Sequence, residues 1–173
     1  ILLVTSVLFT ACASTTSTLS TKSEGKEGIY AALNPRGFPG EIKLIPPASR
    51  VSDLNGKTVY CVSQGETEYP FLQKVVDQLP KYAPGAKGVL VKKPGVYMSD
   101  DPELWNEIAK KASAVIYGPV ASTSGSMWGT HWTVGLEKRG IPSVYMVHKT
   151  WVDNVQISVE KEGMLALRRV IVG

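Results

Sequence analysis

Small hydroxyl-bearing residues and glycine gather in one short stretch that could bind a ligand or take part in catalysis. Residues 121–126 read Ala-Ser-Thr-Ser-Gly-Ser, between a short apolar run and an amphipathic segment. Small residues let the backbone approach a ligand closely, and their hydroxyl and amide groups can donate hydrogen bonds. The start of a following helix adds partial positive charge. We therefore expect an anion or small-ligand cradle that includes Thr123, Gly125 and Ser126.

The same stretch contains candidate nucleophiles. Ser122, Ser124 or Ser126 could attack a substrate if His131 acted as the base. However, the sequence lacks a Gly-x-Ser-x-Gly motif, marks no acid that would orient the imidazole, and places His131 more than a helical turn beyond the serines. The alternative for His131 is a structural helix histidine beside Trp128. Trp128 itself fits either a ligand-binding surface or the core.

A second polar turn, after the first predicted strand, is expected to face this stretch. It contains the candidate ligand-binding residues Ser63, Gly65 and Glu66, and Glu68 follows them. A carboxylate at this place could hold an amine or donate a proton. The alternative is that both glutamates are solvated loop carboxylates.

Apolar runs bounded by turn residues alternate with helical patterns, and these elements position the two turns. Strands are predicted at residues 57–63, 88–92, 113–120, 142–147 and 167–172. Helices are predicted from residue 70, at 101–112, at 127–139 and at 151–162. This alternation predicts an α/β domain with a doubly wound, mostly parallel sheet of the flavodoxin-like or Rossmann-like type. In the strand order 2-1-3-4-5 the carboxyl ends of the first and third strands are neighbours, which brings the two polar turns together.

Composition and charge restrict the class of partner. The 173 residues allow one domain with a tail, and the net charge is +4. Basic residues are interleaved with acidic ones, and pairs such as Lys92-Lys93 are interpreted as solvated charge, so nucleic-acid binding is not expected. With two cysteines and two histidines far apart, the chain has too few ligands for a structural zinc site. No metal or cofactor is expected.

The N-terminal residues predict a lipid-anchored protein. Residues 1–12 are largely apolar and end in Phe-Thr-Ala-Cys, which approximates a lipobox with Cys12 as the lipidated residue. Residues 13–28 predict a flexible tether before an α/β domain at 29–173. The protein would then lie at the periplasmic face of the cell envelope, with the lipid anchor as its membrane contact. The alternatives are a cytoplasmic protein and upstream sequence translated from a wrong start. A closing helix or further domain could follow the fifth predicted strand.

Several stretches resemble one known family. They are residues 34–37, 54–59, 136–142 (Leu-Glu-Lys-Arg-Gly-Ile-Pro) and 162–164, together with a Trp-x-x-His pair at Trp128 and His131. In these stretches the chain resembles the UGSC-motif (seleno)protein family. That family is similar in turn to the selenoprotein B component of glycine, betaine and related reductases. The resemblance implies an oxidoreductase-like domain with a reactive loop after the third strand, near His131.

The serine-rich stretch departs from the family at its reactive position. The family has selenocysteine or cysteine there, followed by Gly, by Ser or Thr, and by Cys. In this chain Ser122 or Ser124 takes the redox position, depending on the alignment, and no thiol remains in the loop. A hydroxyl cannot form a selenenylsulfide or react as a thiolate does. Cys61, within the first predicted strand, is expected to be buried and inert.

Three functions are therefore open. The first is a domain of this family without the redox residue, which binds a small molecule or catalyses a thiol-independent reaction at residues 122–126. The second is an oxidoreductase subunit that uses a thiol from a protein partner or from Cys61. The third is a non-catalytic, lipid-tethered module of the cell envelope.

Overall fold

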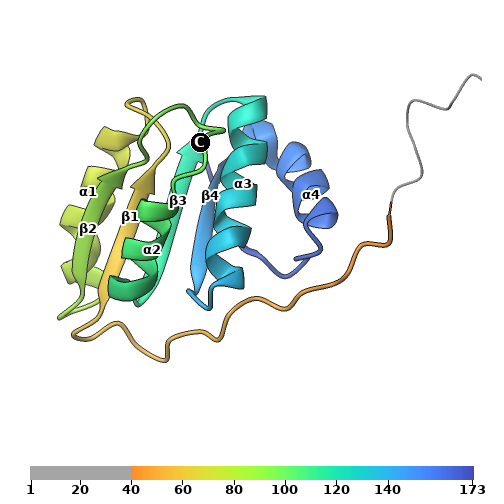
Figure 1. Cartoon of the computed structure of the whole chain (residues 1–173). Coiled ribbons are helices and arrows are strands. Elements are labelled where there is room, and N and C mark those ends of the chain that lie inside the picture. The colour runs from red at the N-terminus through yellow and green to blue at the C-terminus, as the bar shows by residue number, and fades with distance from the viewer. Residues whose placement is uncertain (1–39) are drawn as a thin grey trace, which may run out of the picture. The chain divides into compact units, whose positions relative to one another are not determined.

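A five-stranded parallel sheet forms the centre of the domain. In the computed structural model its strands are β1 (Thr58–Ser63), β2 (Lys87–Lys92), β3 (Ala114–Val120), β4 (Ser143–His148) and β5 (Arg168–Val172). Their order is β2-β1-β3-β4-β5, and every neighbouring pair is parallel (Figure 1). The predicted fold class and strand order are confirmed.

The structure describes residues 40–173. The predicted lipobox with Cys12, the tether at 13–28 and the stretch at 34–37 lie outside these residues, so they stay predictions. Within the described part of the chain, no helix is both long enough and apolar enough to cross a membrane.

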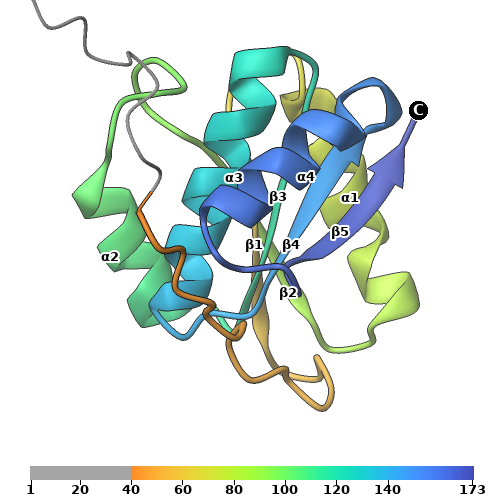
Figure 2. The same cartoon turned by 90° about the vertical axis from the view of Figure 1, so that its right-hand side faces the viewer.

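Four α-helices connect the strands and cover the sheet. They are α1 (Tyr69–Tyr82), α2 (Pro102–Lys111), α3 (Thr123–Lys138) and α4 (Val152–Lys161), with the short 3-10 helix η1 (Lys149–Trp151) before α4. Right-handed crossovers place α1 on one face of the sheet and α2, α3 and α4 on the other (Figure 2). The larger apolar core lies under α2, α3 and α4 and includes the buried Trp105 and Trp132, whose rings stack 5.5 Å apart. A smaller core under α1 contains Cys61 and Leu72.

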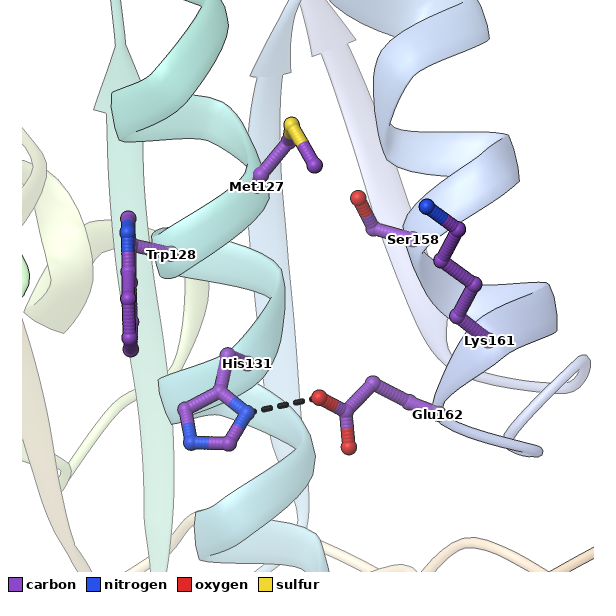
Figure 3. Close-up of a pocket in the computed structure, with 6 residues that line it drawn as sticks. All are labelled: Met127, Trp128, His131, Ser158, Lys161 and Glu162. Carbon is purple, nitrogen blue, oxygen red and sulfur yellow. Dashed lines mark hydrogen bonds and ion pairs between the residues drawn. The ribbon is translucent and has the colours of Figure 1, made fainter. Parts of the chain in front are cut away.

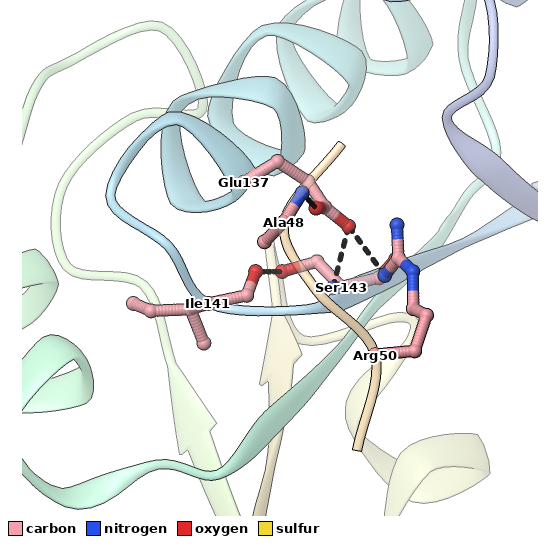
Figure 4. A network of polar contacts seen from close by, with 5 residues as sticks. All are labelled: Ala48, Arg50, Glu137, Ile141 and Ser143. Carbon is pink, nitrogen blue, oxygen red and sulfur yellow. Dashed lines mark hydrogen bonds and ion pairs between the residues drawn. The ribbon is translucent and has the colours of Figure 1, made fainter. Parts of the chain in front are cut away.

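An extended arm, described from residue 40 to the start of β1, packs at the amino edge of the sheet. Its main anchor is Glu137 near the end of α3, whose side chain is fully buried. This carboxylate accepts hydrogen bonds from the amides of Ala48 (2.6 Å) and Ser143 (2.6 Å) and from Arg50 Nη1 (2.7 Å) (Figure 4). One carboxylate therefore joins the arm, α3 and β4.

Candidate functional site

Three loops meet at the carboxyl edge of the sheet, around the N-terminus of α3. They follow β1, β2 and β3, and Figure 1 shows them at the upper edge of the sheet. Because β1 lies between β2 and β3, its loop is central. A hydrogen bond from Gln64 Nε2 to the Gly125 carbonyl oxygen (3.2 Å) joins this loop to the serine-rich stretch. The two polar turns therefore lie side by side, as the strand order predicts.

Most of the serine-rich stretch forms the first turn of α3. Ser122 is the N-cap residue, and its Oγ accepts a hydrogen bond from the Gly125 amide (3.1 Å). The prediction that this helix begins at residue 127 is therefore wrong, because serine favours helix caps as well as loops. The amides of Thr123 and Ser124 precede the first hydrogen bond within the helix, so they face the end of the helix. These two amides and the helix dipole favour an anion at this place.

A buried hydrogen-bond network fixes the edge beneath this turn. The Tyr117 hydroxyl donates to Gln64 Oε1 (3.1 Å), and the Tyr145 hydroxyl donates to the Ser126 carbonyl oxygen (3.1 Å). Burial raises the pKa of both tyrosines, so their hydroxyl groups stay protonated at neutral pH. The sequence does not mark these residues as part of a site, because tyrosines within apolar strands look like ordinary core residues.

Glu68 provides a carboxylate oxygen that has no partner. Its Oε2 is buried and forms no hydrogen bond within residues 40–173. It lies beside the turn after β1, where a Cβ on Gly65 would be 3.2 Å from it. Burial is the main cause of the raised pKa of Tyr117 and of Tyr145, and the negative charge of Glu68 raises both pKa values further. A buried acceptor without a donor costs stability, and a donor group on a ligand would remove that cost.

The other predicted residues of the turn after β1 make local contacts. Glu66 is exposed and pairs with Lys92, which matches the solvated alternative for this glutamate. The Ser63 hydroxyl is buried and donates to the Gly65 carbonyl oxygen. Of the two glutamates in this turn, Glu66 is therefore paired at the surface, and Glu68 has the buried oxygen without a hydrogen-bond partner.

The loop after β2 reaches over the start of α3. The Ser124 hydroxyl donates to the Tyr97 hydroxyl (3.1 Å), and Trp132 Nε1 donates to the Tyr97 carbonyl oxygen (2.8 Å). Tyr97 therefore holds this loop against the first turn of α3, at Ser124, and against a later turn, at Trp132. Its position 27 residues before Ser124 explains why the sequence does not reveal the contact.

Lys93, at the start of the same loop, is buried, with 1% of its surface exposed. Its Nζ donates to two carbonyl groups of its own loop at 3.0 and 3.2 Å and lies 5.5 Å from the centre of the Trp132 ring. Burial lowers the pKa of Lys93, although two nearby aspartates oppose this shift. The prediction of a solvated lysine pair at residues 92–93 is therefore wrong for Lys93, which holds the loop in place.

His131 and Trp128 line a separate groove between α3 and α4 (Figure 3). The groove has a volume of about 270 Å³ and is lined by Met127, Trp128, His131, Ser158, Lys161 and Glu162. His131 Nδ1 lies 2.6 Å from Glu162 Oε1, so an acid does orient this imidazole, although the sequence marks none. This contact turns His131 towards α4, whereas Ser124 contacts the loop after β2. Among the described residues, no hydrogen bond joins His131 to the serines.

The contacts of Glu162 in this groove predict a pH-dependent contribution to stability. Burial alone would raise the pKa of Glu162, but hydrogen bonds from His131 and Lys138 outweigh it and lower that pKa. A carboxyl group with a lowered folded-state pKa stabilises the fold above its unfolded-state pKa, and this contribution is lost as the pH falls through the folded-state value. We expect Glu162→Gln to reduce the free energy of unfolding near pH 7, and the difference to shrink between about pH 5 and pH 3. Urea unfolding at several pH values measures the difference, and a constant value over that range would contradict the prediction.

Cys61 is the only cysteine in the part of the chain that the structure describes. It lies in β1 with no exposed surface, and burial raises its pKa to about 12. The prediction of a buried thiol is confirmed, and a thiol with this pKa stays protonated and unreactive at neutral pH. The groups that the carboxyl edge offers a ligand are therefore hydrogen-bond donors and the Glu68 carboxylate.

The family comparison covers the whole of this edge and the groove beside it. Residues 31–173 match the sequence profile of the UGSC family. The chain belongs to the UGSC family. The predicted resemblance is thus confirmed at the level of the family, and a search of curated proteins found no match. In this UGSC-family domain the predicted site residues form two groups, one around the first turn of α3 and one, Trp128 and His131, in the groove between α3 and α4.

Proposed function

We propose that this UGSC-family domain binds a small molecule at the carboxyl edge of its sheet, between the first turn of α3 and Glu68. The observation that carries this proposal is the buried Glu68 Oε2, which has no hydrogen-bond partner within residues 40–173. The hydrogen bond from Gln64 to Gly125 holds the loop of Glu68 against the first turn of α3. A ligand at this edge could therefore contact both.

The two sides of the proposed site attract ligand groups of opposite charge. The amides of Thr123 and Ser124, with the α3 dipole, favour an anionic group. The Glu68 carboxylate favours a hydrogen-bond donor, and an amine would also neutralise its charge. The ligand class that satisfies both is a small molecule with an anionic group and an amine or similar donor. Any reaction at this edge would use hydrogen bonding and acid-base chemistry.

The experiment is a thermal unfolding screen of the full chain with amino acids, amines, carboxylates, phosphates and thiols. A ligand at a hundred times its dissociation constant adds about 2.7 kcal/mol to stability, which gives a clear rise in Tm. We expect Glu68→Gln to remove most of this rise. Glu66→Gln, which changes an exposed glutamate of the same turn, should keep it. An equal rise in both variants, or no rise with any compound, would refute the proposed site.

We also infer that Ser124 stands where related sequences have a redox-active cysteine or selenocysteine. Ser124 is exposed in the first turn of α3, followed by Gly125 and Ser126. A thiol at a helix N-terminus has a lowered pKa and reacts readily. Ser124→Cys should therefore react with a disulfide reagent much faster than the unchanged protein. If it reacted no faster than an exposed cysteine placed on α2, such as Lys110→Cys, this inference would fail. In the second candidate function, the domain is an oxidoreductase subunit that uses a thiol of a protein partner, and that thiol would act at the position of Ser124.

A further inference from the structure

A second cavity lies at the opposite, amino edge of the sheet, where the arm meets the start of β5. It has a volume of about 490 Å³ and is lined by Pro47, Ala48, Arg50, Ala166, Leu167, Arg168 and Arg169, which we call the arginine cavity. Three of these residues are arginines and none is acidic. Its volume lies in the range of small-molecule sites. None of the residues of the proposed site at the carboxyl edge lines this cavity.

The positive charge of the arginine cavity is only partly neutralised. Arg50 pairs through Nη1 with the buried Glu137 carboxylate, and its other terminal nitrogen points away from that carboxylate (Figure 4). Arg168 and Arg169 form no ion pair with any of residues 40–173. Two full charges therefore remain at this cavity without a carboxylate in contact.

The arginines differ in how firmly they are held. Arg169 is half-buried, and its Nη1 donates to Gln156 Oε1 (2.8 Å) on α4, whose amide nitrogen in turn donates to Glu160. The Glu137 carboxylate fixes the orientation of Arg50 in the same way. Arg168 is exposed. Arg50 and Arg169, held in orientation, and Arg168 line one cavity. Such a lining suits an oxyanion, because one planar guanidinium can bind two of its oxygens.

We propose that the arginine cavity binds a doubly charged oxyanion carried by a small molecule, such as a phosphate monoester. The two unpaired arginine charges match the two charges of the anion. The apolar lining from Pro47, Ala48 and Leu167 would contact the organic part of the ligand. This site is separate from the carboxyl edge, so either proposal can fail without the other.

The test is a binding titration of the full chain with inorganic phosphate, phenyl phosphate and benzoate at constant ionic strength. We expect saturable binding of both phosphates, tighter for phenyl phosphate because of its apolar part, and weaker binding of benzoate. Arg168→Gln together with Arg169→Gln should weaken phosphate binding by about tenfold or more. If the double variant unfolds, Arg168→Gln alone takes its place. The Arg168 side chain is exposed, so this single variant should stay folded, and it should weaken phosphate binding by a smaller factor.

The matched control removes two positive charges elsewhere, with Lys87→Gln and Lys110→Gln on β2 and α2. Phosphate binding should be nearly unchanged in this control. Three results would overturn the proposal: absence of saturable phosphate binding, benzoate binding as tight as that of phenyl phosphate, or an equal loss in the control. Inorganic phosphate that binds more tightly than phenyl phosphate would show that the free ion, and not an ester, is the ligand.

Discussion

Glu137→Ala is expected to lower the free energy of unfolding by about 3–5 kcal/mol, the range for breaking a buried, paired charge. The Glu137 side chain is fully buried, and its carboxylate accepts three hydrogen bonds from groups of the arm and of β4. Without it, the amides of Ala48 and Ser143 lose their acceptor, and the buried side of Arg50 loses its counter-charge. Thermal unfolding should show a fall in Tm of roughly 10 °C or more.

Glu66→Ala is the control for this prediction. Glu66 also forms an ion pair, with Lys92, but it is exposed in the turn after β1. Exposed pairs of this kind contribute little, so the change in Tm should be much smaller. If both variants lost the same stability, the Glu137 network would not be the anchor of the arm.

Gly125→Ala is expected to abolish the ligand-induced rise in Tm and to cost about 1–3 kcal/mol of stability. A Cβ at this position would lie 2.5 Å from Ser122 Oγ, 2.6 Å from Val120 Cγ1 and 3.2 Å from Gln64 Nε2. The helix cap, the end of β3 and the link to the turn after β1 would therefore all have to move. The amides that we expect to bind the anion would move with them.

Gly135→Ala on the same helix is the matched control. A Cβ there would meet only the flexible end of Arg139, at 3.3 Å. Because alanine favours helices more than glycine does, this variant should be as stable as the unchanged protein or more so. It should also keep the full ligand response. A normal ligand response in Gly125→Ala would contradict the role given to the first turn of α3.

The strands could be predicted closely because their residues carry local signals. Each predicted strand differs from the observed one by a single residue at one or both ends, since apolar runs bounded by Gly, Pro or charged residues define them. Strand order followed from the alternation of strands and helices and from the handedness of crossovers. The start of α3 could not be located in the same way, because Ser122 is compatible with a loop and with a helix cap.

The contacts of the candidate site could not be predicted, because they join residues far apart in the chain. Gln64 contacts Gly125 across 61 residues, and the buried Lys93 packs beside Trp132 and donates to carbonyl groups of its own loop. The sequence placed Glu66 and Glu68 in the same turn, but only the structure separates an exposed ion pair from a buried oxygen without a partner. The local sequence shows which residue types are present. Which of their side chains are available to a ligand depends on burial and long-range contacts, which only the folded structure shows.

The most direct test of the proposed site is an NMR titration that follows backbone amide chemical shifts. The ligand is the compound that gives the largest rise in Tm in the thermal screen. The proposed site predicts that the largest shift changes occur at Gly65, Thr123 and Ser124, and that Glu68→Gln removes them. Changes confined to the groove around His131, or to Arg168 and Arg169, would contradict a ligand site at the carboxyl edge.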